Sequence, residues 1–235
     1  MAHGVMINFE LGFELEFYLD STLSDSDLEQ ISKKLHPARL VKERGRLQYE
    51  LITPPYPFID IADLITKYSS HLSDMKLLFA EIAPNIKIDF HPKPNKNDYG
   101  SALQISISSR DLDRSGYLNF IYCLLDRSLD FNTVINKRSG KIRLDERFMA
   151  PTHVAWGGNN NRTVLVRALN LDQDDLSEVR IEYRLANSDA DPKVLAEFVV
   201  DCLQNSIKNN FAKLPKTWGN AYDKQYDNMG LSDAN

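Results

Sequence analysis

The sequence predicts an α+β fold, in which a curved, mainly antiparallel sheet carries helices on its outer face. Two observations lead to this class. Short segments alternate apolar with polar residues, as half-buried strands do, and longer segments between them place apolar residues every three or four positions. Acidic and basic residues also project from the predicted strands. The sheet face opposite the helices should therefore be polar, and it is the expected place for a site.

The first predicted strand is the segment ELGFELEFYL at residues 10–19. Phe13 and Phe17 fall on one side of its period-two pattern, and Glu14 and Glu16 fall on the other. Neighbouring carboxylates on one sheet face repel each other. The pattern therefore indicates either that this face lies in water or that a cation lies over it.

The next elements follow from the same reasoning. Residues 24–35 predict a short helix with a capping-box pattern of Ser26 and Glu29. Residues 46–52 alternate again and predict a strand that ends at the segment TPPYP. Apolar residues keep a spacing of three or four throughout residues 58–82, which predicts a long amphipathic helix.

The second half of the chain continues the alternation of strands and helices. Its expected elements are strands at about 86–90 and 102–108, a helix around 117–125, a long charged loop at 136–151, strands near 163–168 and 179–185, and a helix at about 192–211. From residue 212 the chain is polar and aperiodic. We therefore expect one domain at 1–211 and a frayed polar tail at 212–235.

Composition limits the classes of partner. The chain has 235 residues, 43% of them hydrophobic, and a net charge of −5, which argues against nucleic acid and anionic membranes as partners. It shows neither a bilayer-spanning apolar run nor a signal-peptide pattern. Cys123 and Cys202 lack the spacing of a metal or redox motif and fit reduced core thiols. We expect a cytoplasmic protein.

Charged residues of the predicted strands form the candidate site. Glu14 shares a face with Glu16, and the segment VRIEYR places Arg180, Glu182 and Arg184 on one face. The other members are Glu43, Glu50, Arg162 and Arg167. One interpretation is a solvated face with surface ion pairs of little energetic value. The alternative is a magnesium–polyphosphate site, which needs hard carboxylate ligands for the metal and guanidinium groups for phosphate.

Five segments of this sequence resemble the catalytic domain of glutamine synthetase and its γ-glutamyl ligase relatives, and they occur in the family's order. They are GFELEFYL, ERGRLQYE, FHPKP followed by YGSALQISIS, APTHVAWGGNNNRTVLVR, and RIEYRLANSDADP. The resemblance runs from about Phe9 to Pro192. It implies a funnel-shaped site on an antiparallel sheet, with two Mg²⁺ or Mn²⁺ ions and ATP as co-substrate. A substrate γ-carboxylate would attack the terminal phosphate, and an amine would then displace phosphate from the acyl phosphate.

The resemblance also implies roles for individual residues. Glu16, Glu43 and Glu50 match the ligands of the first metal ion, and Glu14 and Glu182 match ligands of the second, nucleotide-side ion. Arg162 matches the arginine that meets the transferring phosphoryl group, so that Arg162, Glu50 and Arg184 are the expected catalytic residues. Nucleotide contacts are expected from Arg167, Arg180 and Ser108, and glutamate contacts from Arg143 and Arg184.

The sequence departs from the family at several of these positions. Gln104 and Ser106 stand where the family has histidines, so Gln104 would be a neutral, weaker ligand of the second ion. Met149 stands where the family carries a flap glutamate, and a thioether cannot accept a proton from an amine. Only 26 residues separate Glu16 from Glu43, which indicates trimmed loops. The segment that would form the family's N-terminal β-grasp domain is not found in this sequence.

Three functions stay open at this point. The first is an ATP-dependent ligase that joins a carboxylate, such as glutamate, to an amine larger than ammonium. The second is a degenerate, non-catalytic relative that binds nucleotide, metal or a partner protein. The third is another phosphotransferase on the same sheet. A monomer, a homodimer, or a pair with a separate partner chain, is expected rather than stacked six-membered rings.

Overall fold

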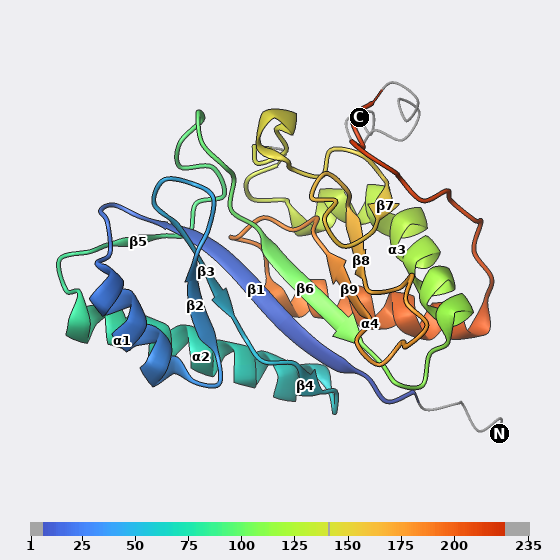
Figure 1. Cartoon of the computed structure of the whole chain (residues 1–235), viewed down its shortest axis with the longest axis horizontal. Coiled ribbons are helices and arrows are strands. Elements are labelled where there is room, and N and C mark those ends of the chain that lie inside the picture. The colour runs from blue at the N-terminus through green and yellow to red at the C-terminus, as the bar shows by residue number, and fades with distance from the viewer. Residues whose placement is uncertain (1–6, 141, 224–235) are drawn as a thin grey trace.

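A nine-stranded sheet lies at the centre of the part of the chain that this computed structural model describes, residues 7–140 and 142–223 (Figure 1). The strand order is β2-β3-β1-β6-β9-β8-β7, and β4 and β5 pair with β1. The bounds are β1 Glu10–Leu19, β2 Arg39–Lys42, β3 Gln48–Ile52, β4 Tyr56–Pro57, β5 Ile88–Asp89, β6 Leu103–Ser108, β7 Trp156–Gly157, β8 Val166–Leu169 and β9 Arg180–Tyr183. Only the β7–β8 pair is parallel among these strands. The mainly antiparallel α+β class is confirmed.

The helices are α1 Asp25–Leu35, α2 Ile61–Ile82, α3 Arg114–Ile135 and α4 Pro192–Lys208, with a short 3₁₀ helix, η1, at Glu146–Phe148. Figure 1 shows α2 and α4 running behind the sheet. Aspartate side chains cap three of the long helices: Asp60 accepts from the Asp63 N–H, and Asp113 accepts from the Gly116 N–H. Asp191 caps α4, where Pro192 occupies the first turn.

The apolar side of β1 forms the core, as its alternation predicts. Phe13 and Phe17 are buried and contact α2, with ring centroids 4.7 Å apart for Phe13–Tyr68 and 6.3 Å apart for Phe17–Phe79. On the other half of the sheet, Tyr183 of β9 lies 5.5 Å from the ring of Phe198 on α4. The helices therefore cover one face, and the polar face of the same strands is left for the site.

Several elements differ from the sequence-based expectation. The cap of α1 is Ser24, whose hydroxyl accepts from the Asp27 N–H at 3.1 Å, so the predicted Ser26–Glu29 capping box is wrong. Strand β2 was not predicted, because four residues are too few to display a period. Helix α3 extends well beyond its predicted end at residue 125, to Ile135. Its last turns bury Ser128 and Asn132, which breaks the apolar pattern.

The described part of the segment after residue 211 lies against the domain. The Thr217 N–H donates to the Trp156 carbonyl at 2.9 Å, and the Trp156 indole N–H donates to the Leu214 carbonyl at 3.0 Å. The Tyr222 hydroxyl donates to the Ala150 carbonyl. Residues 212–223 therefore do not show the fraying that their composition predicts, and residues 224–235 lie outside the described part.

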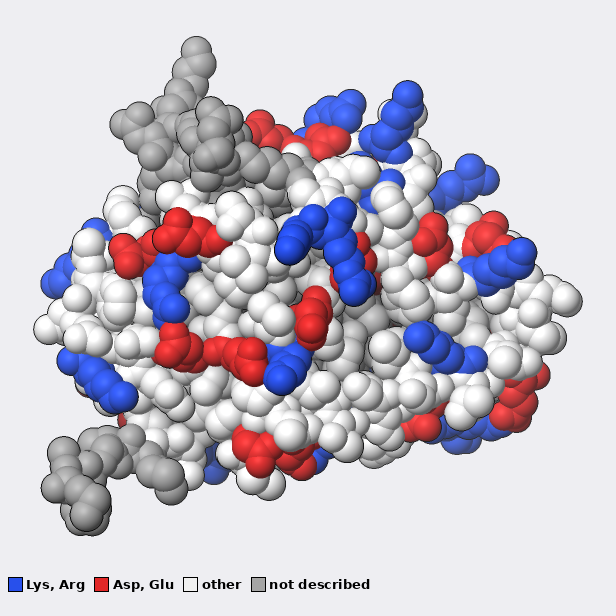
Figure 2. All heavy atoms as spheres, turned by 180° about the vertical axis from the view of Figure 1, so that it is seen from behind, with Lys and Arg blue, Asp and Glu red and all other residues white. Residues whose placement is uncertain are grey.

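Lysine and arginine side chains alternate with aspartate and glutamate on the face that Figure 2 shows, so this face carries no large area of one sign. No helix within residues 7–140 and 142–223 combines the length and apolarity needed to cross a bilayer. Cys123 and Cys202 are buried and form no disulfide, as expected for core thiols.

Candidate active site

The predicted site residues gather on the polar face of the sheet because strand register brings them side by side. Glu16 of β1 lies opposite Glu50 of β3, and Glu14 of β1 lies opposite Gln104 of β6. Arg167 of β8 lies opposite Glu182 of β9. A cavity of about 170 Å³ on this face is lined by ten of the predicted residues: Glu14, Glu16, Glu43, Glu50, Gln104, Arg162, Arg167, Arg180, Glu182 and Arg184.

The carboxyl groups of this cavity are crowded and desolvated. Burial, and then the charge of Glu182, raise the pKa of Glu14 to about 7. Burial, followed by the charges of Glu14, Glu16 and Glu43, raises the pKa of Glu50 well above its ordinary value. Within the described residues the Glu50 carboxyl makes no ion pair or side-chain hydrogen bond. These carboxylates therefore repel one another unless positive charge compensates them.

Three arginines surround Glu182, which is only 1% exposed. Arg167 forms a tight ion pair with its Oε2, and Arg180 lies 4.0 Å from the same oxygen and 3.5 Å from Glu14. Arg184 Nε lies 3.1 Å from Glu182 Oε1, yet that oxygen accepts no hydrogen bond. The reason is that the Arg184 N–H is directed to Gln104 Oε1 at 3.2 Å. A buried carboxylate oxygen thus keeps an unused lone pair in the cavity.

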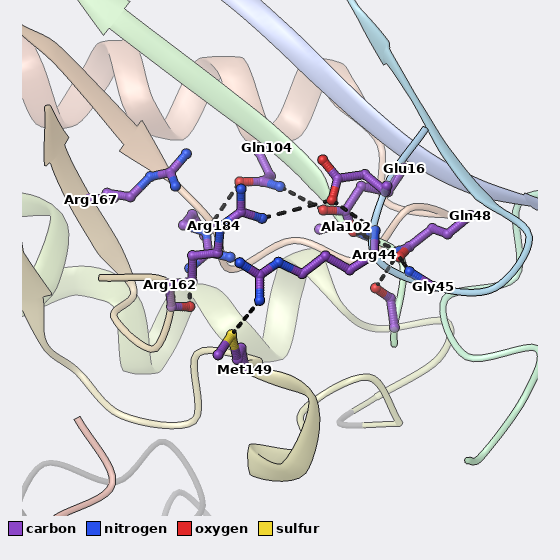
Figure 3. A network of polar contacts seen from close by, with 12 residues as sticks. Glu16, Arg44, Gly45, Gln48, Ala102, Gln104, Met149, Arg162, Arg167 and Arg184 are labelled. Carbon is purple, nitrogen blue, oxygen red and sulfur yellow. Dashed lines mark hydrogen bonds and ion pairs between the residues drawn. The ribbon is translucent and has the colours of Figure 1, made fainter. Parts of the chain in front are cut away.

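Gln104 connects the acidic and basic halves of the site (Figure 3). Its amide nitrogen donates to Glu16 Oε1 at 2.9 Å, while its amide oxygen accepts from Arg184. Glu16 Oε2 accepts from the Ala102 N–H at 2.8 Å and from Gln48 Nε2 at 3.3 Å. Burial nevertheless dominates and raises the pKa of Glu16 to about 7. In this arrangement the amide oxygen of Gln104 faces a guanidinium group.

The two arginines that were predicted to hold the substrate are also anchored to the protein. Arg143 is 4% exposed, and its Nη2 donates to the carbonyls of Arg184 and Leu185 at 2.9 and 2.8 Å. Burial lowers the pKa of Arg143 to about 10. Gly100 packs so closely against Arg143 that a Cβ at that position would overlap it. Arg184 donates to the carbonyls of Arg162 and Val164.

Arg162, Ser108 and Arg143 line spaces that adjoin the central cavity. Arg162 lies 3.8 Å from Glu43. Ser108 does not line the central cavity; it lines the two neighbouring cavities of about 260 and 800 Å³, both of which also contact Arg180. Arg143 lines a narrow cavity on the opposite side, together with Glu16, Arg184 and Met149. Space therefore extends from the carboxylates in both directions along the sheet.

The loop that carries Met149 is held in place by a lysine that the sequence analysis did not assign. Lys93 is 7% exposed and donates to the Asp98 carbonyl. Its Nζ lies 3.8 Å from Asp145 and 4.0 Å from the ring centroid of Phe148, both in the Met149 loop. Burial lowers the pKa of Lys93. In the sequence Lys93 lies between Pro92 and Pro94, and this segment gives no signal of its burial, because lysine is seldom buried.

The sequence analysis also did not assign three further residues to the site, Gln48, Arg39 and Arg44. Gln48 lies two positions before Glu50, so the alternation of β3 would have placed it on the polar face. Arg39 lines the central cavity from β2, the strand that was not predicted. Arg44 reaches Met149, with its Nη1 lying 3.7 Å from the sulfur (Figure 3).

The donor chemistry of the cavity fits a hard divalent cation. Carboxylate oxygens are the ligands that Mg²⁺ and Mn²⁺ prefer, and Glu182 Oε1 is buried without a hydrogen bond. Among the residues the structure describes, however, no three His, Cys, Asp or Glu side chains converge as a ligand group. The carboxylates would therefore have to draw closer together around an ion.

Comparison with known proteins identifies the family and the fold. The family model "Glutamine synthetase, catalytic domain" matches residues 32–233. A cryoEM structure of Plasmodium falciparum glutamine synthetase superposes with a TM-score of 0.72 at 16% sequence identity, over 92% of this chain and 54% of that chain. The chain thus spans about half the length of that enzyme, and the likeness at this identity shows the fold alone. No curated protein matches the sequence. The family model covers most of the chain, and the chain therefore belongs to the glutamine synthetase catalytic-domain family.

Proposed function

We propose that this chain is an ATP-dependent carboxylate–amine ligase of the glutamine synthetase type that works through an acyl phosphate. The observation that carries the proposal is the crowding of buried carboxyl groups beside arginines on one sheet face. Glu14, Glu50 and Glu182 are each at most 7% exposed. Clustering buried like charges is costly without a compensating cation, so the arrangement supports binding of metal and phosphate.

Two divalent ions would be held by the carboxylates. Glu16, Glu43 and Glu50 are the proposed ligands on one side, and Glu14 and Glu182 are those on the nucleotide side, with Gln104 as a neutral neighbour. Bound Mg²⁺ or Mn²⁺ supplies positive charge at the transferring phosphate. Without an ion, the amide oxygen of Gln104 faces Arg184, so it would have to turn to act as a ligand.

The chain's own residues would bind the nucleotide and the carboxylate substrate. Arg180 is proposed to bind the nucleotide phosphates, because it contacts both the central cavity and the adjoining space of about 800 Å³ where Ser108 lies. Arg167, on β8, would also bind the nucleotide phosphates. Arg162 would stabilise charge on the transferring phosphoryl group. Arg143 and Arg184 would orient a carboxylate such as that of glutamate, and their backbone contacts keep both guanidinium groups pre-positioned.

A second candidate is a non-catalytic relative that binds nucleotide or metal. The contact that favours it is the Gln104 bridge, which satisfies Glu16 and Arg184 with a neutral amide. Because the Gln104 amide hydrogen-bonds to both charged groups, Glu16 is stabilised there without a metal ion. This candidate predicts nucleotide binding without turnover.

The deciding experiment measures ADP release from MgATP or MnATP with glutamate and a panel of amines, beside calorimetry of nucleotide binding. The ligase proposal expects amine-dependent ADP release that Arg162→Ala lowers at least about 100-fold. Arg46→Ala is the matched control, because Arg46 is exposed and lines none of the cavities described above. Nucleotide binding without ADP release for any amine would reject the ligase and favour the second candidate.

A further inference from the structure

A second large cavity adjoins the candidate site on the far side of Met149. Its volume is about 760 Å³, which is large enough for an organic substrate. It shares Arg44, Met149 and Arg162 with the narrow cavity that contains Glu16, Arg143 and Arg184. A molecule bound there would therefore lie beside the residues that are proposed to handle the acyl phosphate.

The charges around this cavity favour an anionic group. Arg44, Arg162 and Lys216 line it, together with one carboxylate, Asp172, which forms a tight ion pair with Lys216. Arg162 is itself paired with Glu43, so the charge that is left belongs mainly to Arg44. Arg162 lies 3.8 Å from Glu43, and Arg44 Nη1 contacts the sulfur of Met149, which is a weak acceptor. A guanidinium with so weak a partner is well suited to bind a carboxylate.

The far wall of the cavity is aromatic. Trp218 is 75% exposed, and Lys216 Nζ lies 4.3 Å from its ring centroid. The ammonium group therefore makes a cation–π contact with the indole. Asn159, Asn160 and Asn161 add amide groups to the lining. The cavity thus offers an apolar surface and neutral polar groups in addition to the arginines.

We propose that this cavity binds the acceptor amine of the reaction, and that the acceptor is an amino acid rather than ammonium or a polyamine. The inference rests on the proposed ligase function. An α-amino acid carries its amine and its carboxylate on one carbon, so the carboxylate can bind Arg44 while the amine faces the site beside Met149. Its side chain then extends toward Trp218. A polyamine would bring more positive charge to the two arginines.

The transfer step balances without a further reactant. The nitrogen lone pair forms a C–N bond to the acyl carbon as the C–O bond to phosphate breaks. Inorganic phosphate leaves with that electron pair. The ammonium form of the amine loses one proton to water before the attack, which frees the lone pair, and the nitrogen loses a second proton to water as the amide forms. Met149 takes no proton in this step, because a thioether is not a base at neutral pH.

The test compares each amino acid of a panel with the amine formed by removing its carboxylate, for example phenylalanine with phenethylamine, and includes spermidine. Binding is measured by calorimetry and by Trp218 fluorescence, neither of which requires turnover. At least one amino acid should bind about tenfold or more tightly than its decarboxylated partner. Arg44→Met should remove this preference, whereas Arg46→Met should keep it. Trp218→Phe should abolish the fluorescence change but retain binding in the calorimeter.

Two results would overturn the inference. One is that no amino acid binds, and the other is that the decarboxylated amines or spermidine bind as tightly as the amino acids. Binding of an amino acid without ADP release would reject the ligase function instead, and it would leave the cavity as a carboxylate-selective amine site. The two failures are therefore distinguishable.

Discussion

Glu14→Gln should stabilise the metal-free protein, and most strongly at alkaline pH. Burial, and then the charge of Glu182, raise the pKa of Glu14 from 4.5 to about 7, although Arg180 acts in the opposite direction. A carboxyl group whose pKa is higher in the folded state than in the unfolded state stabilises the folded protein while it is protonated. This contribution is complete at pH values below the unfolded pKa. That contribution is lost as the pH rises through the folded value. The relevant window therefore runs from pH 4.5 to about 7.

The size of the effect follows from this difference. One pKa unit corresponds to about 1.4 kcal/mol, so ionised Glu14 costs about 3 kcal/mol of folding free energy at pH 8 and under about 1 kcal/mol at pH 5. The Glu14→Gln variant would avoid that cost while keeping the shape of the side chain. For a domain of this size the gain corresponds to a rise in Tm on the order of 6–12 °C at pH 8.

Urea denaturation with a chelator present, at pH 8 and pH 5, provides the measurement. Glu10→Gln is the matched control, because Glu10 belongs to the same strand but is exposed. It should change the free energy of unfolding by no more than about 0.5 kcal/mol. The reasoning is refuted if Glu14→Gln gives no stabilisation at pH 8, or if its effect is equal at the two pH values.

Three further predictions concern the metal, its neighbour and the core. Millimolar Mg²⁺ or Mn²⁺ should raise the Tm of the wild-type protein, and Glu50→Gln should remove that rise in a thermal-shift assay; no rise at all would contradict the metal site. Gln104→His should tighten Mn²⁺–nucleotide binding in calorimetry, because an imidazole nitrogen replaces a neutral amide oxygen, and unchanged affinity would count against this role. Phe17→Ala should lower the free energy of unfolding by about 3–5 kcal/mol, since Phe17 is fully buried against α2. A loss below about 1 kcal/mol would mean that this part of the core is not packed as described.

Much of the fold was predictable because the spacing of apolar residues, which indicates the type of element and its buried side, is a local property of the sequence. The alternation in β1 correctly separated Phe13 and Phe17 from Glu14 and Glu16, and the spacing in residues 58–82 correctly indicated α2, which begins at Ile61. The cap of α1 and the end of α3 were missed because each depends on contacts that a period does not encode. The same holds for β2, whose four residues are recognisable only from their pairing with β3.

The membership of the candidate site was predictable to a similar extent, but its connections were not. Alternation placed Glu182 on the polar face, whereas its pairing with Arg167 depends on the register of β8 and β9. Likewise, nothing near Arg143 in the sequence indicates that its guanidinium donates to carbonyls more than 40 residues away. The catalytic, ligand and nucleotide roles of these residues stay predictions.

The contacts of the Met149 loop have a consequence for where the chain can be shortened. The loop is tied to Lys93 through Asp145 on one side of Met149 and to Tyr222 through Ala150 on the other. A chain ending at residue 211 would contain all the described strands and the four long helices, but it would lack Ala221, which is fully buried against Ala155 and Val164. It would lose the second tie, together with Trp218. Residues 212–223 therefore belong to the same folding unit as the sheet, and shortening the chain at residue 211 would remove contacts of both β7 and the Met149 loop.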